Sequence, residues 1–375
     1  MKIAAIKERV KGENRVAITP DIASLFVKKG YTVFVEKNIG TLANFTDAEY
    51  ENAGATVSAV LLEVLSDADI ILKVQPTPFI DEFNEIDMTR SGAVIIGMLS
   101  PYTNFEYIEK SLSKKLATIA MELVPRVTKS QNMDVLSSQS NLAGYRAVIE
   151  AGYYFDRAFP MMMTAAGTIN PAKTLILGVG VAGLQAIATA KRLGSIVSAY
   201  DVRAATKEQV ESLGAKFLYP GNANSDAEDK SGYAKEIDKD FALMQEKFLS
   251  EIIAGFDIII TTAQIPGKRA PLMLTQKMIA KMRPGSVIVD MATATGGNVQ
   301  DSSPDKVVSK RGVKIIGWTN MAAKIASDSS RLYAKNLYNF IDYAVKNGKF
   351  NFKDELVEEM LIGIDGKMIN KKFKV

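Results

Sequence analysis

Three glycines near the middle of the 375-residue chain have the spacing of a nucleotide-binding turn. Gly178, Gly180 and Gly183 directly follow a short apolar run and directly precede a helical pattern. The first glycine would permit a tight turn, the second would let the backbone approach a pyrophosphate, and the third would let helix and strand pack closely. The helix start at Val181 and Ala182 would present free amides and the positive end of the helix dipole to phosphates.

A carboxylate follows at the distance that such a turn requires. The next apolar run, 196–200, ends at Asp201, ~20 residues after the last glycine. A carboxylate at this place binds the ribose hydroxyls of NAD and repels the 2′-phosphate of NADP, whereas Arg203 favours NADP. Val202 lies between them and is expected beside the same ribose. Three glycines alone also fit a tight turn between core elements, but the order of strand, glycines, helix and carboxylate predicts an NAD(H) site.

The chemistry of the chain is limited by two residue types that it lacks. The sequence contains neither Cys nor His. Without Cys there are no disulfides, thiolate nucleophiles or cysteine metal sites, as is typical of a reducing compartment. Without His, the commonest general acid/base and the commonest metal ligand are missing. Catalysis would depend on carboxylates, Lys, Tyr, Ser or a cofactor, and we expect no metal site.

Two α/β regions surround the glycine motif. The chain is longer than the ~250–300 residues at which a single core stops growing, so two domains are expected. In both regions, β-rich runs alternate with helical patterns, which predicts parallel sheets with helices on both faces. We predict two Rossmann-like, doubly wound parallel-sheet domains separated by a cleft. Residues 1–135 with 325–375 would form the first domain, and residues 136–324 the NAD(H)-binding domain.

The expected strands follow the apolar runs of each region. In the first region they are 3–6, 32–35, 69–74, 93–96 and 118–122. In the second they are 174–177, 196–200, 216–218, 257–260, 286–289 and 313–316. Six strands with helical patterns between them match a complete dinucleotide-binding fold.

The remaining segments connect or complete these sheets. A polar, irregular stretch at 126–140 is interpreted as a crossing between the domains, followed by a helix over 142–155. The polar run 221–232 is expected to form a long surface loop, with a helix over 235–253. A last helix, within 322–345, should cross back to the first domain. The residues expected to pack there are Leu332, Leu337, Phe340 and Ile341.

Charge and hydropathy exclude two kinds of partner. The 46 basic and 42 acidic residues give a net charge of +4 and form no block suited to nucleic acid or a membrane surface. The least charged stretch, 158–190, is broken by prolines and glycines, so we interpret it as core rather than a membrane span. The amino-terminal residues lack the pattern of a signal peptide. We expect no nucleic-acid partner, no direct membrane insertion and a cytoplasmic location.

Four longer motifs resemble one family. They are RVTKSQNMDVLSSQSNLAGYR at 126–146, RAFPMMMTAAG at 157–167, GYAK at 232–235 and TTAQIPGK at 261–268. Together they resemble the NAD(H)-binding component, the first domain of the alpha subunit, of proton-translocating nicotinamide nucleotide transhydrogenase. The resemblance extends over nearly the whole chain.

The resemblance implies a function that needs partners. In this family, of the Si/Re-specific type, hydride passes directly from NADH on this component to NADP⁺ on a partner component. A membrane component couples that step to proton translocation. The implied partners are therefore an NADP(H)-binding subunit and a membrane-spanning subunit, which would place the chain at the inner face of the cytoplasmic membrane. The family also implies a homodimer.

The resemblance also assigns site residues. Catalytic positions that hold the nicotinamide end of the cofactor, or close over it, correspond to Arg126, Gln131, Asp134, Ser137 and Tyr233. Further cofactor contacts implied by the match are Val127, Thr128, Asn132, Met133, Gly232, Gln245 and Gln264. Direct hydride transfer requires no proton abstraction, so positioning is the main task of these residues. Without the resemblance, 126–137 fits a hydrogen-bonded linker and Tyr233 an exposed loop tyrosine. One departure is Ala294, where the family usually has Glu.

Two other functions stay open on the sequence. A soluble alanine dehydrogenase is related and has the same two-domain plan, and Arg15 and Lys73 match substrate-binding residues of that family. Its acid/base histidine has no counterpart in this chain. In a transhydrogenase, these two cations would be structural groups paired with acidic neighbours such as Glu13. The third possibility is an NAD-sensing module, which need not keep Arg126 and Gln131 together.

Overall fold

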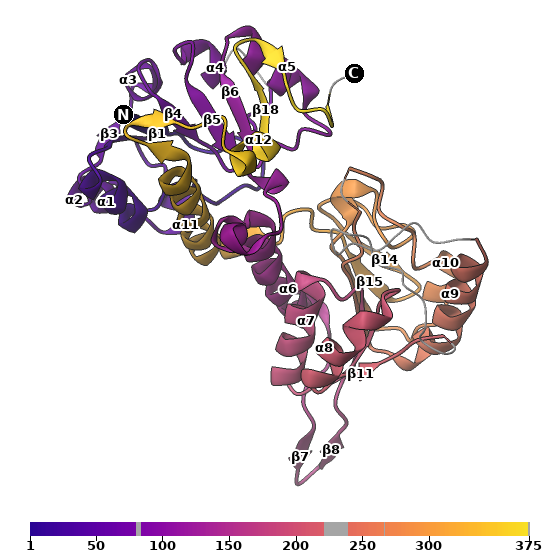
Figure 1. Cartoon of the computed structure of the whole chain (residues 1–375). Coiled ribbons are helices and arrows are strands. Elements are labelled where there is room, and N and C mark those ends of the chain that lie inside the picture. Colours follow the sequence, from indigo (N-terminus) through magenta and orange to yellow (C-terminus); the bar gives the residue numbers. More distant parts are fainter. Residues whose placement is uncertain (80–83, 221–238, 266, 374–375) are drawn as a thin grey trace. The chain divides into compact units, whose positions relative to one another are not determined.

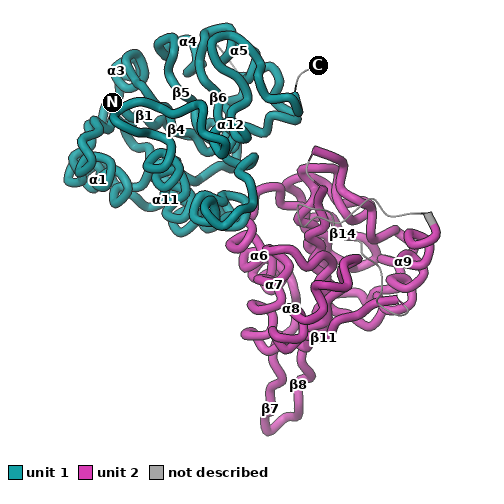
Figure 2. Tube along the Cα trace, viewed as in Figure 1, with its two compact units in different colours: residues 1–139, 322–375 teal, residues 140–321 magenta. Residues whose placement is uncertain are grey.

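The computed structural model describes residues 1–79, 84–220, 239–265 and 267–373 (Figure 1). The chain divides into two compact units (Figure 2). Unit 1 comprises residues 1–139 and 322–375, and unit 2 comprises residues 140–321. The chain passes between them twice, once inside helix α6 (Val135–Tyr154) and once just before the 3-10 helix η7 (Ala322–Ile325).

Unit 1 is built on an eight-stranded sheet with the order β19-β18-β6-β5-β4-β1-β2-β3. Its parallel strands are β1 (Lys2–Ala5), β2 (Thr32–Glu36), β3 (Thr56–Ser58), β4 (Ile70–Leu72), β5 (Val94–Gly97) and β6 (Ala117–Ala120). Two antiparallel strands extend it, β18 (Leu361–Ile364) and β19 (Lys367–Met368). The five predicted strands are confirmed. The short strand β3 and the antiparallel pair were not predicted, since their alternation is too brief to stand out.

Helices cover both faces of this sheet, because residues alternate between two cores along each strand. Ile3 and Ala5 belong to a core formed with α1 (Pro20–Lys28), α2 (Asp47–Asn52), α11 (Ala326–Ala344) and α12 (Glu355–Met360). Ala4 belongs to the opposite core, formed with α3 (Leu61–Leu65), α4 (Glu85–Met88) and α5 (Phe105–Ser113). The doubly wound arrangement predicted for the first region is confirmed.

Helix α11 packs on unit 1 as predicted, with one exception. Leu337, Phe340 and Ile341 are fully buried in the core. Leu332 is 44% exposed, so its predicted packing was wrong. The buried face of the helix is instead continued by Tyr333 and Ala334, and Leu332 lies one position off that face.

Unit 2 has a seven-stranded sheet with the order β11-β10-β9-β12-β13-β15-β14. The parallel strands are β9 (Lys173–Leu177), β10 (Ile196–Tyr200), β11 (Lys216–Phe217), β12 (Ile258–Thr261), β13 (Val287–Asp290) and β15 (Val313–Ile316). All six predicted strands are present, and the order is that of a doubly wound nucleotide fold. The edge strand β14 (Val307–Lys310) is antiparallel to β15 and was not predicted.

The helices of unit 2 form one layer on each face of its sheet. One core combines alternate strand residues with α6, α7 (Val181–Arg192) and α8 (Lys207–Ser212). The other combines the intervening strand residues with α9 (Lys239–Ile252) and α10 (Gln276–Ile279). A two-stranded hairpin, β7 (Met162–Thr164) and β8 (Gly167–Ile169), extends away from the rest of this unit (Figure 1).

Two connecting segments differ from what the sequence predicts or lie beyond comparison with it. The stretch 126–140 is not irregular as predicted, because it contains the 3-10 helix η3 (Thr128–Met133) and the first turn of α6. Local hydrogen bonds of Asp134 to Ser137 start this helix seven residues earlier than the predicted 142. The predicted loop 221–232 lies outside the described residues. Within the described parts of the chain, no helix is both long and apolar enough to cross a bilayer.

A glycine in α6 determines how closely two helices of unit 2 approach. A Cβ atom on Gly144 would lie only 2.1 Å from the carbonyl oxygen of Ala182 in α7. Any side chain at this position would therefore push the two helices apart. Because α7 starts at the glycine turn, the close approach also positions that turn.

We expect Gly144→Ala to lower the free energy of unfolding by about 1–3 kcal/mol, because a well-packed contact would be overfilled. Urea denaturation monitored by circular dichroism measures this change. Gly255→Ala is the matched control, since a Cβ there meets no atom within 4 Å. Similar stabilities of the two variants would contradict the proposed contact.

Candidate functional site

The glycine turn of unit 2 has the geometry that the sequence predicts. Gly178 follows β9 with φ of +95°, and a Cβ there would lie 2.7 Å from Thr262 Oγ1. A Cβ on Gly183 would lie 2.0 Å from the carbonyl oxygen of Gly178, so only glycine lets helix and strand approach this closely. A Cβ on Gly180 would meet no atom within 4 Å, which leaves the space above the turn open.

The start of α7 is available for an anion. Gly180 is its N-cap, and no side chain caps the first turn. The amide groups that open the helix therefore keep their hydrogen-bonding capacity for a ligand, and the helix dipole adds a partial positive charge. Val181 is exposed and Ala182 is half-buried. These residues fit the pyrophosphate of a dinucleotide.

Asp201 lies at the end of β10 and stabilises the turn from below. Its Oδ2 accepts a 2.6 Å hydrogen bond from the backbone N–H of Val179, between the first two glycines. Both carboxylate oxygens also accept 2.9 Å bonds from the Arg203 guanidinium, which in turn donates to the carbonyl oxygen of Val179. Asp201 and Val202 are buried. The sequence predicted Asp201 beside the ribose, but it did not predict this carboxylate–guanidinium pair.

A second buried carboxylate organises the neighbouring loops. Asp290, fully buried at the end of β13, accepts backbone hydrogen bonds from Ala292, Asn298 and Val299. Asn298 then donates 2.8 Å bonds to the carbonyl oxygens of Ala263 and Pro271. Its Oδ1 is buried and has no partner. The loops after β12 and β13 are thus joined, at the edge where ligands of parallel sheets bind.

Sequence reasoning missed Asp290, Asn298 and Thr262 as site residues. Thr262 Oγ1 donates to the carbonyl oxygen of Gly178 at 2.9 Å and packs where a larger residue at 178 would stand. The available signal was their place, since all three directly follow strands that end at the same edge. Ala294, at the family's usual Glu position, lies in η6 (Thr293–Thr295) of this loop.

The other predicted residues of the second domain are less uniform. Gln264 is exposed, and its side chain donates to the carbonyl oxygen of Met291 at 2.9 Å. Gln245 is buried on α9. Gly232 and Tyr233 lie outside the described residues.

The predicted nicotinamide loop lies in unit 1, from the end of β6 to the first turn of α6. Its side chains are mostly exposed, namely those of Arg126, Val127, Thr128, Gln131 and Asn132. Met133 is an exception, because it is buried in the core of the unit. Asp134 accepts bonds from the Ser137 backbone N–H at 2.9 Å and from its hydroxyl at 2.5 Å.

The backbone of this loop is fixed from both sides. Asn336 and Asn339 of α11 both donate to the carbonyl oxygen of Asn132, at 2.8 and 2.9 Å. Ser130 donates to the carbonyl oxygens of Pro125 and Val127. A loop with a fixed backbone and outward polar side chains is suited to positioning a ligand.

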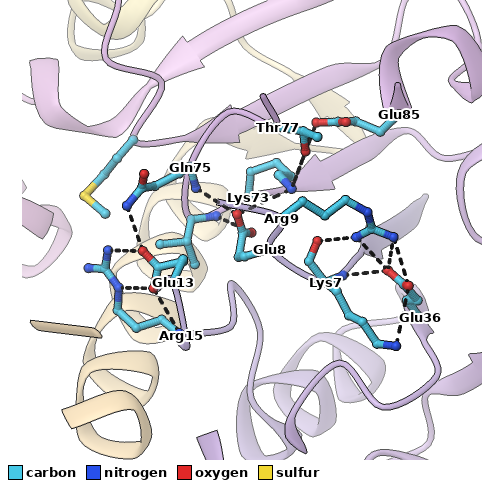
Figure 3. A network of polar contacts seen from close by, with 12 residues as sticks. Lys7, Glu8, Arg9, Glu13, Arg15, Glu36, Lys73, Gln75, Thr77 and Glu85 are labelled. Atoms are coloured by element: carbon cyan, nitrogen blue, oxygen red, sulfur yellow. Dashed lines mark hydrogen bonds and ion pairs between the residues drawn. The ribbon is translucent and has the colours of Figure 1, made fainter. Parts of the chain in front are cut away.

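A network of buried charges lies at the carboxyl ends of the unit 1 strands (Figure 3). Lys73 Nζ lies 3.1 Å from Thr77 Oγ1, 3.4 Å from Glu8 Oε2 and 4.0 Å from Glu85 Oε1. Burial raises the pKa of Glu8, although the positive charge of Lys73 acts in the opposite direction. Burial also raises the pKa of Glu122, at the end of β6, to about 7.

Arg15 belongs to the same network and is paired with Glu13. Its guanidinium donates to both oxygens of Glu13, at 2.8 and 2.6 Å, and to Gln139 Oε1 at 2.8 Å. All three residues are buried. The expected pairing of Arg15 with Glu13 is confirmed, and Lys73 is also paired with acidic neighbours.

Comparison with known proteins relates the chain to one family. Residues 4–143 match the alanine dehydrogenase/PNT N-terminal domain, and residues 147–371 match the alanine dehydrogenase/PNT C-terminal domain. The chain is 63% identical over 370 residues to the first of the parts that make up the NAD(P) transhydrogenase alpha subunit of Rickettsia prowazekii strain Madrid E. That match covers 99% of this chain and 96% of the relative.

Solved structures show the same relationship. The crystal structure of transhydrogenase from Sinorhizobium meliloti has 45% sequence identity and a TM-score of 0.88, covering 98% of this chain and 99% of that chain. An L-alanine dehydrogenase structure has a TM-score of 0.84 at 23% identity, covering 100% of this chain and 98% of that chain. At this lower identity, the second match shows a common fold only.

The pair between Asp201 and Arg203 leads to a prediction about cofactor choice. Asp201→Ala removes the carboxylate and releases Arg203 for a 2′-phosphate. We expect the affinity ratio of NADPH to NADH to rise about tenfold, equivalent to roughly 1.4 kcal/mol. Fluorescence titration of both nucleotides measures the ratio. In the double variant with Arg203→Ala, the gain should disappear, and an unchanged ratio in the single variant would remove Asp201 from the ribose site.

Proposed function

The chain belongs to the alanine dehydrogenase/PNT family, and on that premise we propose that it is the NAD(H)-binding component of a transhydrogenase. It would pass hydride directly between NADH and NADP⁺ held by a partner component. The observation that carries this proposal is the open glycine turn at the uncapped start of α7, in a chain that contains no histidine. The turn fits a dinucleotide, and hydride transfer between two nicotinamides needs no protein acid/base.

The residues of the chain would bind and orient the cofactor. When bound, the nicotinamide ring supplies the hydride. The amides at the start of α7 bind the pyrophosphate, and the Asp201–Arg203 pair shapes the ribose end. Gln131 and Arg126 project from the loop before α6 to address the nicotinamide end, and Asp134 with Ser137 stabilises the helix start. Gly232 and Tyr233 would complete the site from a segment outside the described residues.

The proposed partners follow from the single nucleotide-binding turn in this chain. One glycine fingerprint accounts for NAD(H), so NADP(H) must be bound elsewhere, on an NADP(H)-binding subunit. Proton translocation would require a membrane-spanning subunit, and through it the chain would lie at the inner face of the cytoplasmic membrane. The name of the Rickettsia prowazekii relative, one portion of an alpha subunit, supports this division of labour.

We also propose a homodimer, and the hairpin β7–β8 supports it. Its strands are exposed along their whole length and carry apolar side chains. Those exposed on the hairpin and just before it are Met161, Met162, Met163 and Ile169. A projecting apolar arm of this kind is stabilised when a second copy covers it.

Oxidative deamination of alanine is not favoured by the site. The guanidinium of Arg15 is saturated by Glu13 and Gln139, and Lys73 is enclosed by Glu8, Glu85 and Thr77. These groups would have to exchange partners before they could bind a substrate carboxylate. The chain also offers no histidine as an acid/base.

Stopped-flow measurement of hydride transfer tests the proposal directly. The full chain with NADH is mixed with the NADP(H)-binding component of a transhydrogenase loaded with an NADP⁺ analogue. We expect fast transfer that requires both proteins, and no reaction with L-alanine, or with pyruvate plus ammonia. Turnover of alanine by the chain alone would instead identify an amino-acid dehydrogenase, and NADH binding without either reaction would identify a sensor.

The exposed Gln131 leads to a prediction that separates chemistry from affinity. In Gln131→Asn the amide is displaced by one methylene length, and misplacement of about 1 Å can cost up to ~100-fold in rate. We expect single-turnover hydride transfer to fall at least about tenfold, while the Kd for NADH changes less than about threefold. Gln276→Asn, on α10, is the matched control and should change neither quantity. Equal losses in rate and affinity would show that Gln131 serves binding alone.

A further inference from the structure

The two points where the chain leaves and re-enters unit 1 are connected by buried hydrogen bonds. Gln139 is the last residue of unit 1 before the first crossing, and Ala322 is the first residue after the second. The side chain of Gln139 donates to the carbonyl oxygen of Ser329 at 3.1 Å. The hydroxyl of Ser329 donates to the carbonyl oxygen of Ala322 at 2.5 Å. Both ends of unit 1 are therefore joined through α6 and α11.

Arg15 is the charged centre of this connection. Its Nη1 donates to Gln139 Oε1 at 2.8 Å, across 124 residues of sequence. Arg15 is 4% exposed and Gln139 is 6% exposed. The next residue, Val16, donates its backbone N–H to Ser330 Oγ at 3.0 Å. The segment around Arg15 thus binds the start of α6 and the start of α11 at once.

The other side of Arg15 is anchored to the unit 1 sheet (Figure 3). Glu13 accepts two bonds from the Arg15 guanidinium and a third, of 2.8 Å, from Gln75 Nε2. The backbone N–H groups of Val74 and Gln75 donate to Glu8, at 2.8 and 3.1 Å. A continuous polar path therefore runs from the end of β4 to the first turns of α6.

We infer that Arg15 is a positioning residue for hydride transfer, acting through Gln139 on the start of α6 and on the loop that precedes it. The inference rests on the proposed function, because that loop and helix turn carry Gln131, Asp134 and Ser137. Arg15 touches neither cofactor nor substrate in this role. It fixes the helix start against the sheet.

The energetics make Arg15 hard to replace. Both members of the Arg15–Glu13 pair are almost fully removed from water, so each depends on the other for compensation of its charge. Burial alone would lower the pKa of Arg15, but the contact with Glu13 raises it above its ordinary value. Lysine would keep the charge but lose the planar fork that reaches Glu13 and Gln139 together.

The test compares Arg15→Lys with Arg9→Lys. Arg9 is a matched control because its guanidinium also bonds both oxygens of a glutamate, at 3.0 and 3.1 Å, but that glutamate, Glu36, ends β2 and is not a neighbour of α6 in the polar path. In the stopped-flow assay with the partner component, we expect Arg15→Lys to slow transfer about tenfold or more. Its Kd for NADH should stay within about threefold of wild type, and Arg9→Lys should alter neither quantity.

A second variant keeps the inference testable if Arg15→Lys does not fold. Gln139→Met removes the bond to Arg15 but leaves the pair with Glu13 intact, so no buried charge is left unpaired. It should also slow transfer without a matching loss of NADH affinity. Transfer at the wild-type rate in either folded variant would overturn the inference.

Hydrogen exchange separates this inference from the proposed function. Failure of the wild-type chain to transfer hydride at all would contradict the proposed function. The positioning effect would then still be measured, without a partner, as amide exchange of residues 134–139 by mass spectrometry. We expect at least about tenfold faster exchange there in Arg15→Lys than in Arg9→Lys. Equal exchange in the two variants would show that Arg15 does not position the helix start.

Discussion

Buried carboxylates at the carboxyl ends of parallel strands are the constraint on which both units depend. A carboxylate removed from water is stable only when charges or N–H groups surround it. In unit 2, Asp290 gathers the backbone of its own loop and Asp201 gathers that of the glycine turn. In unit 1, Glu8 and Glu13 do the same for the end of β4 and for Arg15. The loops follow the paths that satisfy these groups.

This constraint explains how loops near a ligand site can be well positioned. The loops after β12 and β13 are joined through Asn298, whose position is set by Asp290. The turn after β9 is braced from below by Asp201 and from the side by Thr262. With its own polar groups satisfied internally, the turn can leave the first amides of α7 to a phosphate.

The loop before α6 follows the same rule in unit 1. Its carbonyl groups are bound by Asn336, Asn339 and Ser130, so its backbone makes no demand on a ligand. Its exposed side chains include Arg126 and Gln131, which remain oriented outward. For direct hydride transfer, in which geometry rather than proton transfer limits the rate, such a division between fixed backbone and outward side chains is what the chemistry requires.

Much of the fold could be predicted because its signals are local. Runs of buried β-branched residues predicted the central parallel strands, and the spacing of three glycines predicted the turn with its positive φ at Gly178. The absence of histidine excluded whole classes of chemistry without any coordinates. The short edge strands β3, β14 and β19 were missed, since two to four residues of weak alternation carry too little information.

What the sequence by itself determined was therefore the fold class, the nucleotide turn and the types of residue available for chemistry. Each of these depends on neighbours along the chain, which a sequence displays directly. Only the tertiary structure decided which polar groups meet across long separations, such as Arg15 with Gln139 or Asn298 with Ala263. It also decided that Leu332 faces solvent while Tyr333 faces the core. Such pairings depend on how sheets and helices pack, and packing brings together residues whose relation no local pattern records.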